Sequence, residues 1–305
     1  LRRDSRLVII DTFAVLPKIA QDGAFNELYL KGLAEEATEY GHDVLHLYRL
    51  YGSRNPKLLW NAFGVLARQE RKGLTEAHLL RASDWLRLLR HFFCYPLALF
   101  RLIRSLRSYP PGSPESYIRE ALISTAGQCV MLGEARRLCG YRLGLLLAGR
   151  PFVRPAGNAS VHSANHSPGH LPPLPGDQST LLVSWYENQT VNKCLFRGLA
   201  QAEKRSGRHI PSLGAQLFLW PSALLNNHPD DGEAALGLAP DRVLVNGPYF
   251  LPEKTSQQYA VGPSLRYGDL FREAARQTRA GSKKAHATTG IIQAGGSGLE
   301  TPSPS

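Results

Sequence analysis

The feature that most constrains the fold is a repeated alternation of short apolar runs with longer segments of helical spacing. The run from Leu7 to Phe13 has the length and composition of a strand that is buried on both faces. The segment 25–40 follows it with apolar residues at helical spacing, and the pattern ends at Gly41. Strands that alternate with helices in this way form a parallel sheet covered by helices. The sequence therefore predicts an α/β protein with a Rossmann-like parallel sheet.

The same alternation organises the rest of the chain. Further strands are expected over 43–48, 179–185, 215–220 and 242–245, and helices over 58–71, 76–109, 116–139 and 188–205. We interpret 1–150 as a Rossmann-like region whose long basic helices form a helix-rich middle insertion. The segment 151–179, rich in Pro, Gly, Ser and His, is expected to be a linker or loop. The segment 180–271 then continues the α/β domain and leads to an interdomain junction.

The net charge of +11 is concentrated in one region of the chain. Between positions 49 and 150 there are 17 Lys and Arg residues against 6 Asp and Glu, so the remainder is close to neutral. Arginines recur there at three- and four-residue steps among apolar residues: Arg87, Arg90, Arg101, Arg104 and Arg107. This pattern predicts a pair of basic amphipathic helices over 87–107, broken at Pro96.

Two interpretations of these basic helices remain open. They are either ordinary solvated helix faces over a core or a peripheral contact with anionic membrane lipid. The sequence has no RNA-binding signature and no zinc-finger spacing, so we expect no nucleic-acid partner. It also has no run of eighteen uncharged apolar residues. We therefore expect a cytoplasmic protein, attached at the inner face of the cell membrane if the basic helices bind lipid.

Neither a metal site nor a cofactor is expected. The histidines His162, His166 and His170 would share one face of a helix, but Pro168 and Pro172 argue against a helix there. The four cysteines stand far apart and form no metal-binding pairs.

Ligands of parallel α/β sheets bind beyond the carboxyl ends of the strands, so the residues at those ends are candidates for a site. Four such groups lie at the ends of predicted strands: Asp11 and Thr12; Trp185, Tyr186, Glu187, Asn188 and Gln189; Trp220, Pro221 and Ser222; and Asn246 and Gly247. The second group is the most informative. A carboxylate, amides and aromatic faces suit the binding of a sugar, and Glu187 would act as a general base toward an acceptor hydroxyl. A structural interpretation is also open, in which Glu187 or Asn188 caps the next helix and Trp185 and Tyr186 belong to the core.

Several short segments share their order and spacing with a known group of proteins. They are Trp185 to Gln189, Asn192-Lys193, Arg197-Gly198-Leu199, Gly214-Ala215-Gln216, Ala239 to Val243, Val245-Asn246-Gly247 and Val261 to Tyr267, with Asp11-Thr12, Tyr29, Gly32 and Leu33 near the start. In these segments the chain resembles GT-B-type glycosyltransferase-like proteins of bacterial surface-carbohydrate and capsular polysaccharide biosynthesis. The resemblance covers about 7–271 and is most specific over 185–267.

The resemblance implies two Rossmann-like domains that face a cleft and transfer a sugar from a nucleotide-sugar donor to a glycan acceptor. The amino-terminal domain of such proteins receives the acceptor, and the second domain binds the donor. Glu187 is then the catalytic base or an acceptor contact, Asn188 and Gln189 are polar sugar contacts, and Trp185 is a stacking wall. Asn246, Gly247 and Arg266 lie nearer the junction, where Arg266 either meets a phosphate or is an ordinary surface residue.

The segment 272–305 does not continue this pattern. It is rich in Gly, Ser, Thr and Pro where an apolar strand should begin the second domain, so we expect a disordered tail and a second domain that is missing or incomplete. The tail is either native or the product of a truncated reading frame. A chain without a donor domain would be inactive alone, and the alternative function is a noncatalytic module that binds a glycan or a partner.

Overall fold

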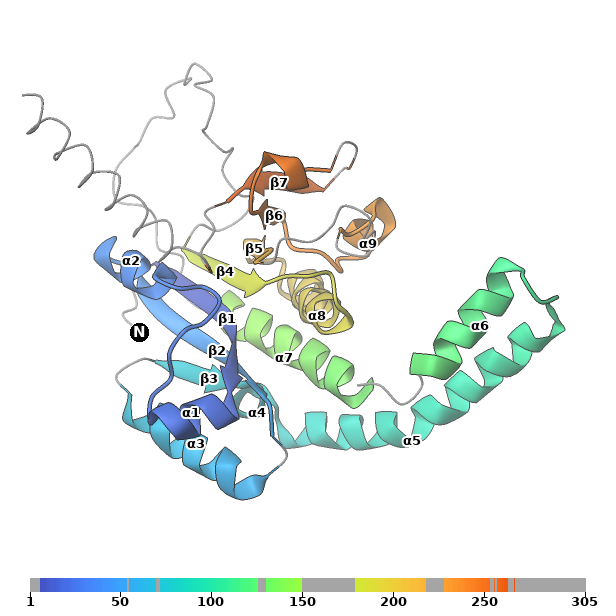
Figure 1. Ribbon diagram of the computed structural model, residues 1–305, viewed down its shortest axis with the longest axis horizontal. Helices are drawn as coiled ribbons and strands as arrows, with labels where there is room; N and C mark the ends of the chain where they lie inside the picture. Colours follow the sequence, from blue (N-terminus) through green and yellow to red (C-terminus); the bar gives the residue numbers. More distant parts are fainter. Residues whose placement is uncertain are drawn as a thin grey trace, which may run out of the picture.

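The protein forms one parallel sheet with helices on both faces (Figure 1). The computed structural model describes residues 6–53, 55–69, 72–125, 130–149, 179–217, 228–252, 255, 257–262 and 266. Within these residues the sheet has seven strands in the order β3-β2-β1-β4-β5-β6-β7, and every neighbouring pair is parallel. The strands are β1 (Leu7–Val15), β2 (Asp43–Tyr51), β3 (Gly73–Thr75), β4 (Thr180–Trp185), β5 (Ser212–Ala215), β6 (Arg242–Val245) and β7 (Gln258–Val261). The α/β, Rossmann-like fold class is thereby confirmed.

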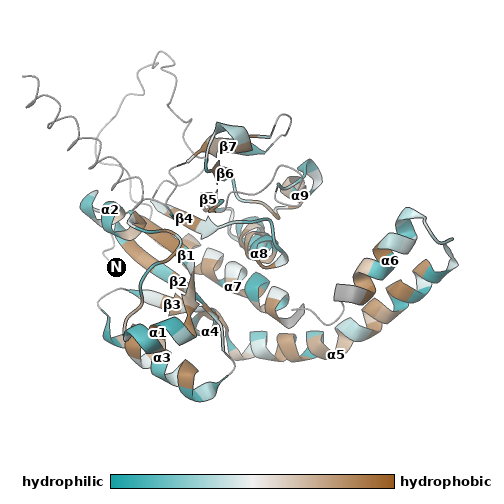
Figure 2. Cartoon of the chain, in the orientation of Figure 1, coloured by the Kyte–Doolittle hydropathy of each residue, from teal (hydrophilic) through white to brown (hydrophobic). Residues whose placement is uncertain are grey.

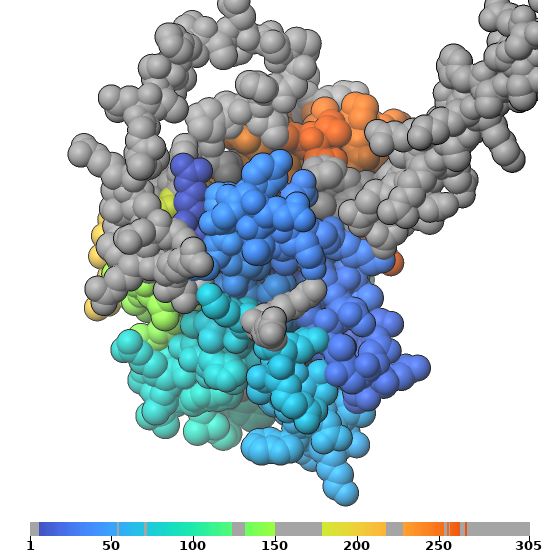
Figure 3. All heavy atoms as spheres, turned by 90° about the vertical axis from the view of Figure 1, so that its left-hand side faces the viewer, coloured from blue at the N-terminus to red at the C-terminus, as the bar shows by residue number. Residues whose placement is uncertain are grey.

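Strand β1 lies at the centre of the sheet and is buried on both faces. Leu7 and Ile9 pack in the core cluster of α7 (Val130–Ala148) and α8 (Thr190–Ser206), whereas Val8 and Ile10 pack on the opposite face. That face is covered by α1 (Leu16–Asp22), α2 (Leu33–Glu39) and α3 (Pro56–Arg68), which lie together when the molecule is viewed from that side (Figure 3). Burial on both faces explains why the sequence of β1 is an uninterrupted apolar run.

Helices α7 and α8 pack against each other with their backbones in close contact. A Cβ atom on Gly198 of α8 would lie 2.0 Å from the carbonyl oxygen of Arg137, and one on Gly140 of α7 would lie 2.2 Å from that of Leu195. Small residues at a helix crossing allow this approach. The predicted helix-rich middle therefore contributes α7 directly to the core beneath the sheet.

The helix expected over 25–40 is shorter than predicted, because only its second half is helical. The Glu27 carboxylate accepts hydrogen bonds from the backbone N–H groups of Tyr29 and Leu30 and from the Thr12 hydroxyl, at 3.0, 3.2 and 2.8 Å. These bonds hold the segment in a turn. Gly32 then adopts a left-handed conformation, with φ 77°, immediately before α2 begins.

The expected break at Pro96 is wrong. A single helix, α5 (Ala82–Ser105), continues through this residue and is followed by the 3-10 turn η1 (Leu106–Ser108). Pro96 is exposed, so the Phe92 carbonyl that loses its helical donor can bond to water. The break lies earlier, between α4 (Glu76–Leu79) and α5, where the Asp84 carboxylate accepts a 2.9 Å bond from the backbone N–H of Arg81.

Other boundaries also differ from the predictions. The helix expected over 116–139 is divided into α6 (Pro114–Thr125) and α7, with 126–129 outside the described residues. The strand expected over 215–220 lies earlier, as β5, and 218–220 are not described. Five further elements were not predicted from the sequence, and most are too short to show a period: α1, β3, β7, α9 (Asp231–Ala235) and the 3-10 turn η3 (Pro248–Phe250).

The boundaries proposed for the domains are only partly covered by the structure. Strands from 1–150 and from 180–271 belong to the same sheet, because β1 pairs directly with β4. The expected linker at 151–179, apart from Ser179, and the expected tail at 272–305 lie outside the described residues.

The close contact of α7 and α8 predicts the effect of a single methyl group. Gly198→Ala should lower the free energy of unfolding by about 2–3 kcal/mol, because the new Cβ would overlap backbone atoms that cannot move freely. Gly64→Ala is the matched control, since Gly64 is in α3 and its Cβ would meet nothing within 4 Å. That change should raise stability by about 0.5–1 kcal/mol in urea unfolding. Equal stability of the two variants would contradict the packing described.

Candidate functional site

A pocket opens at the point where the strand order of the sheet reverses. The chain proceeds from β1 to β2 and β3 on one side, and from β4 to β7 on the other, so the switch lies between β1 and β4. Phe13 of β1, Arg49 of β2 and Trp185 of β4 line a cavity of about 420 Å³ near the carboxyl ends of these strands. We call it the switch-point pocket. In open α/β sheets this is the position where ligands bind.

One wall of the switch-point pocket is aromatic. The rings of Trp185 and Tyr29 are stacked, with centroids 5.2 Å apart and planes 8° apart. Phe13 meets Trp185 edge to face at 4.4 Å. The guanidinium of Arg266 lies 5.6 Å from the centre of the Tyr29 ring. Such a cluster offers flat apolar surface with a cation beside it.

The floor of the pocket is a buried network of charges around Asp11. The Asp11 carboxylate forms ion pairs with Arg49 of β2 and Arg136 of α7. It also accepts a 2.6 Å hydrogen bond from the Ser184 hydroxyl of β4. Arg136 makes a further ion pair of 2.8 Å with Glu76 of α4. Four separate elements besides β1 are thus joined through one carboxylate and its arginines.

The network keeps Asp11 charged although it is completely buried. Burial alone would raise the pKa of Asp11, but the positive charges of Arg136 and Arg49 and the hydrogen bonds it accepts lower that pKa to about 2. Burial lowers the pKa of Arg136, and the charges of Asp11 and Glu76 more than reverse this, so its pKa is raised. Two arginines therefore face two carboxylates, and the floor carries no net charge.

Two donors of this network, Nη1 of Arg49 and Nε of Arg136, have no acceptor in the described part of the chain. The Nη1 atom of Arg49 is buried and makes no hydrogen bond within the described part of the chain. The Arg49 side chain is only 7% exposed and lines the pocket. A buried N–H group without an acceptor costs stability, and an oxygen atom of a ligand could satisfy it.

The structure brings some of the predicted site residues to this pocket and places others elsewhere. Trp185 and Gln189 line it, and Arg266 contacts its Tyr29 ring. Tyr186 is completely buried in the core on the α7 and α8 face of the sheet. Its hydroxyl donates a 2.8 Å bond to the side-chain oxygen of Asn188.

Asn188 turns away from the switch-point pocket. It has a left-handed backbone, with φ 53°, and its side-chain amide donates to the carbonyl oxygen of His228 at 3.0 Å. Asn246 and Gly247 follow β6, which is separated from β4 by β5, and neither lines the pocket. These three residues are therefore not brought together with Trp185.

Glu187 is buried next to the pocket without lining it. It is 5% exposed, and its Oε2 atom accepts a 3.3 Å bond from the side chain of Gln189, which does line the pocket. The turn is held by Asn192 of α8, whose side chain donates to the Trp185 carbonyl at 2.7 Å and accepts from the Gln189 backbone at 3.3 Å. The Gln189 side chain therefore separates the Glu187 carboxylate from the pocket.

The charged floor was not predicted from the sequence. Asp11 was a candidate only as a strand-end residue, and Arg49, Glu76 and Arg136 were not selected. Charged residues inside the apolar strands β1 and β2 were an available signal, because a buried charge requires a partner. Arg136 carried no comparable signal, since its role depends on where α7 packs.

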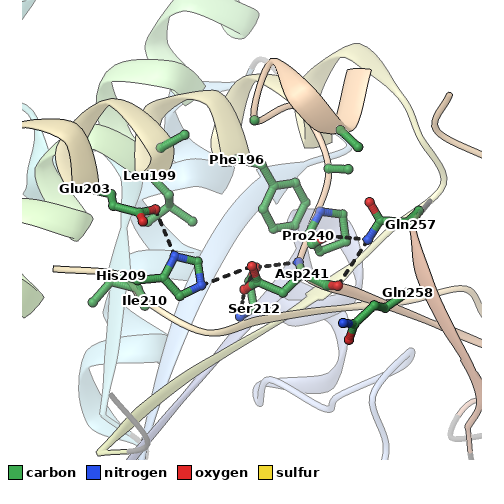
Figure 4. Close-up of a pocket in the computed structure, with 14 residues that line it drawn as sticks. Phe196, Leu199, Glu203, His209, Ile210, Ser212, Pro240, Asp241, Gln257 and Gln258 are labelled. Carbon is green, nitrogen blue, oxygen red and sulfur yellow. Dashed lines mark hydrogen bonds and ion pairs between the residues drawn. The ribbon is translucent and has the colours of Figure 1, made fainter. Parts of the chain in front are cut away.

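A second pocket lies at the other end of the strands, near the amino-terminal ends of β5 and β6 (Figure 4). His209 is held there between Glu203 of α8 at 2.8 Å and Asp241 at 3.0 Å. Asp241 also accepts hydrogen bonds from the backbone and hydroxyl of Ser212, at 2.7 and 2.8 Å. The bond to Asp241 is the main reason that the pKa of His209 is raised to about 9. This arrangement ties α8 to the starts of two strands, which is a structural role.

Comparisons with protein-family models, with curated proteins and with solved structures give no match to this chain. In the described part of the chain, no helix combines the length and the apolar character needed to cross a membrane. The described His, Cys, Asp and Glu residues form no group of three that could hold a metal ion. The expected histidine series 162, 166 and 170 lies outside the described residues.

The Asp11 network predicts a large loss of stability when its centre is neutralised. Asp11→Asn should lower the free energy of unfolding by about 3–5 kcal/mol, because two buried arginines lose their shared counter-charge. Asp22→Asn is the control, since Asp22 forms only a 3.4 Å pair with partly exposed Lys18 and should change stability by less than about 0.5 kcal/mol. Urea unfolding measures both, and a small effect at Asp11 would show that the network is not required.

The His209 pair predicts a pH dependence in the alkaline range. Because the pKa of His209 is raised from 6.5 to about 9, its contribution to stability is complete below about pH 6.5 and is lost as the pH rises through about 9. His209→Gln should therefore flatten the decline in unfolding free energy across this interval, by about 1 kcal/mol. Parallel pH profiles for the variant and the parent protein would exclude this role.

Proposed function

We propose that this chain binds a glycan in the switch-point pocket, as the acceptor-binding part of a glycosyltransferase-like protein of surface polysaccharide biosynthesis. The observation that carries the proposal is the combination of an aromatic wall and a polar floor at the reversal of the strand order. The resemblance of the sequence to GT-B-type proteins supplies the class of reaction.

The chemistry of the pocket suits a sugar. The C–H faces of a sugar ring pack on aromatic side chains such as Trp185. Its hydroxyl groups can bond to the Gln189 amide, to the Glu76 carboxylate and to the unsatisfied Nη1 atom of Arg49. A cavity of about 420 Å³ falls within the ordinary range for small-molecule sites.

In the proposed reaction Glu187 would take the proton of an acceptor hydroxyl as that oxygen attacks the anomeric carbon of the donor sugar, and the bond from this carbon to the phosphate would break so that the nucleotide leaves. The nucleotide-sugar donor would be held by a second Rossmann-like domain, as the resemblance implies. Transfer would take place at the cytoplasmic face of the cell membrane. Glu187 is buried beside Gln189. The Gln189 side chain would therefore have to rotate before the Glu187 carboxylate is exposed to the pocket.

A second candidate function is a noncatalytic glycan-binding module. The observation that favours it is the engagement of both nearby carboxylates: Glu76 is paired with Arg136, and Glu187 accepts a hydrogen bond from Gln189. In such a module Glu187 would position Gln189 and would transfer no proton.

The glycan-binding proposal predicts a selective effect at Trp185. Neutral and uronic-acid-containing oligosaccharides should bind to the chain in calorimetric titration, and Trp185→Leu should weaken that binding about tenfold by removing the stacking surface. Trp60→Leu is the control, because Trp60 is an exposed tryptophan of α3 outside the pocket. Thermal unfolding establishes that each variant is folded. Undiminished binding by Trp185→Leu would contradict the proposal.

Glu187→Gln separates the two candidate functions. If Glu187 is a catalytic base, the parent chain should transfer sugar from a nucleotide-sugar to an acceptor oligosaccharide when a GT-B donor-binding domain is supplied in trans. The variant should then lose at least about a hundredfold of that turnover, while acceptor affinity is little changed. If the chain is a binding module, neither protein transfers sugar and only affinity responds. Glu120→Gln, at an exposed position of α6, should leave both properties unchanged.

A further inference from the structure

Among the described residues, exposed large apolar side chains are most numerous on α5, which extends away from the sheet together with α6 (Figure 1). Helix α5 has 24 residues and is therefore about 36 Å long. Seven of its large apolar side chains are each more than half exposed: Trp85, Leu86, Leu89, Phe92, Phe93, Leu97 and Phe100. We refer to these seven residues as the aromatic face of α5.

The aromatic face occupies one continuous side of the helix. At 100° per residue its seven members fall within a sector of about 140°. Leu88 and Leu99, which lie outside this sector, are 2% and 9% exposed, so the packed side of the helix is a different one. The helix therefore uses one strip for its own packing and presents a broad second apolar side to the surroundings. Folded proteins rarely leave so large a patch uncovered without a function.

Positive charges border the aromatic face. Arg87, Arg90, Arg101 and Arg104 are all exposed on α5. The single acidic residue of this fully described helix, Asp84, is buried and pairs with Arg142 of α7 at 2.7 Å. Hydrophilic and hydrophobic residues alternate along the ribbon in the manner of an amphipathic helix (Figure 2). The exposed charge of α5 is consequently all positive.

The charge decides which occupant fits this surface best. A second copy of the chain would bring the arginines of two α5 helices together without an exposed carboxylate of α5 to compensate them. An RNA or DNA backbone would use the arginines but not the aromatic face. An anionic bilayer uses both, because aromatic and aliphatic side chains enter the boundary between headgroups and acyl chains while arginines meet anionic headgroups.

We propose that α5 binds to the surface of an anionic lipid bilayer and lies in its plane, with the aromatic face inserted and Arg87, Arg90, Arg101 and Arg104 against lipid headgroups. This binding does not depend on glycan recognition, so either proposal can fail without the other. It requires no membrane-spanning helix.

Co-sedimentation of the full chain with vesicles tests the proposal. We expect binding to phosphatidylcholine vesicles that contain phosphatidylglycerol, and at least tenfold weaker binding to phosphatidylcholine alone. Phe92→Ser combined with Phe93→Ser should weaken binding to the anionic vesicles by about tenfold or more. Arg90→Gln combined with Arg101→Gln should weaken it about fivefold for each charge and have little effect on neutral vesicles.

The control is a pair of aromatic residues away from α5 that are more exposed than Phe92 and Phe93. Tyr40→Ser combined with Tyr249→Ser removes two side chains that are each 75% exposed, and vesicle binding should remain unchanged. All substitutions are at exposed positions, so thermal unfolding should be unaltered. The proposal is overturned if the chain binds neither vesicle, or if the phenylalanine and tyrosine variants behave alike. If the chain binds no vesicle and instead dimerises through Phe92 and Phe93 in analytical ultracentrifugation, the occupant of the aromatic face is a second copy of the chain.

Discussion

The ion pairs of the buried Asp11 carboxylate hold the centre of the molecule together. Asp11 is on the middle strand, Arg49 is on the next strand, and Arg136 is on the helix beneath them. None of these charges could be buried alone, because the cost of removing a charge from water is recovered only when its partners are in place. The position of α7 and the pairing of β1 with β2 and β4 are therefore linked. The same side chains form the floor of the switch-point pocket, so the fold and the candidate site depend on one interaction.

The sequence predicted the elements whose signal is local and repeated. The apolar run of β1 and the helical period of α8 were both recognised, and α8 begins and ends within two residues of the expected limits. Prediction failed where a single contact overrides the pattern. Glu27 holds a turn in place of the first half of an expected helix, and Pro96 is accommodated because it is exposed to water. The shortest strands carry too few residues for any period to be visible.

The candidate site was predicted in part for the same reason. The rule that ligands lie beyond strand ends selected Trp185 and Gln189, which do line the pocket. It also selected Asn188, whose left-handed backbone directs its side chain toward His228 instead. The charged floor depends on Arg136, and its position follows from the packing of α7 on α8, where Gly140 and Gly198 let the two backbones meet. Such long-range packing leaves no periodic trace in a sequence.

The two proposals combine into one physical picture. The switch-point pocket would hold a glycan acceptor, and α5 would hold the protein at an anionic membrane, where lipid-linked or growing polysaccharides are found. Each feature has its own physical basis. The pocket depends on burial, stacking and ion pairing, whereas the surface of α5 depends on exposed apolar area and positive charge. In this proposal Trp185 and the aromatic side chains of α5 would serve two separate surfaces.

The most direct test of glycan binding at the switch point is an NMR titration of the tryptophan indole N–H signals with an acidic oligosaccharide. The signals of Trp185, Trp60 and Trp85 can be assigned by substituting each residue in turn. Binding in the switch-point pocket predicts a saturable shift of the Trp185 signal while those of Trp60 and Trp85 stay in place. A shift confined to Trp60 or Trp85, or no change at Trp185 when calorimetry shows binding, would contradict the account.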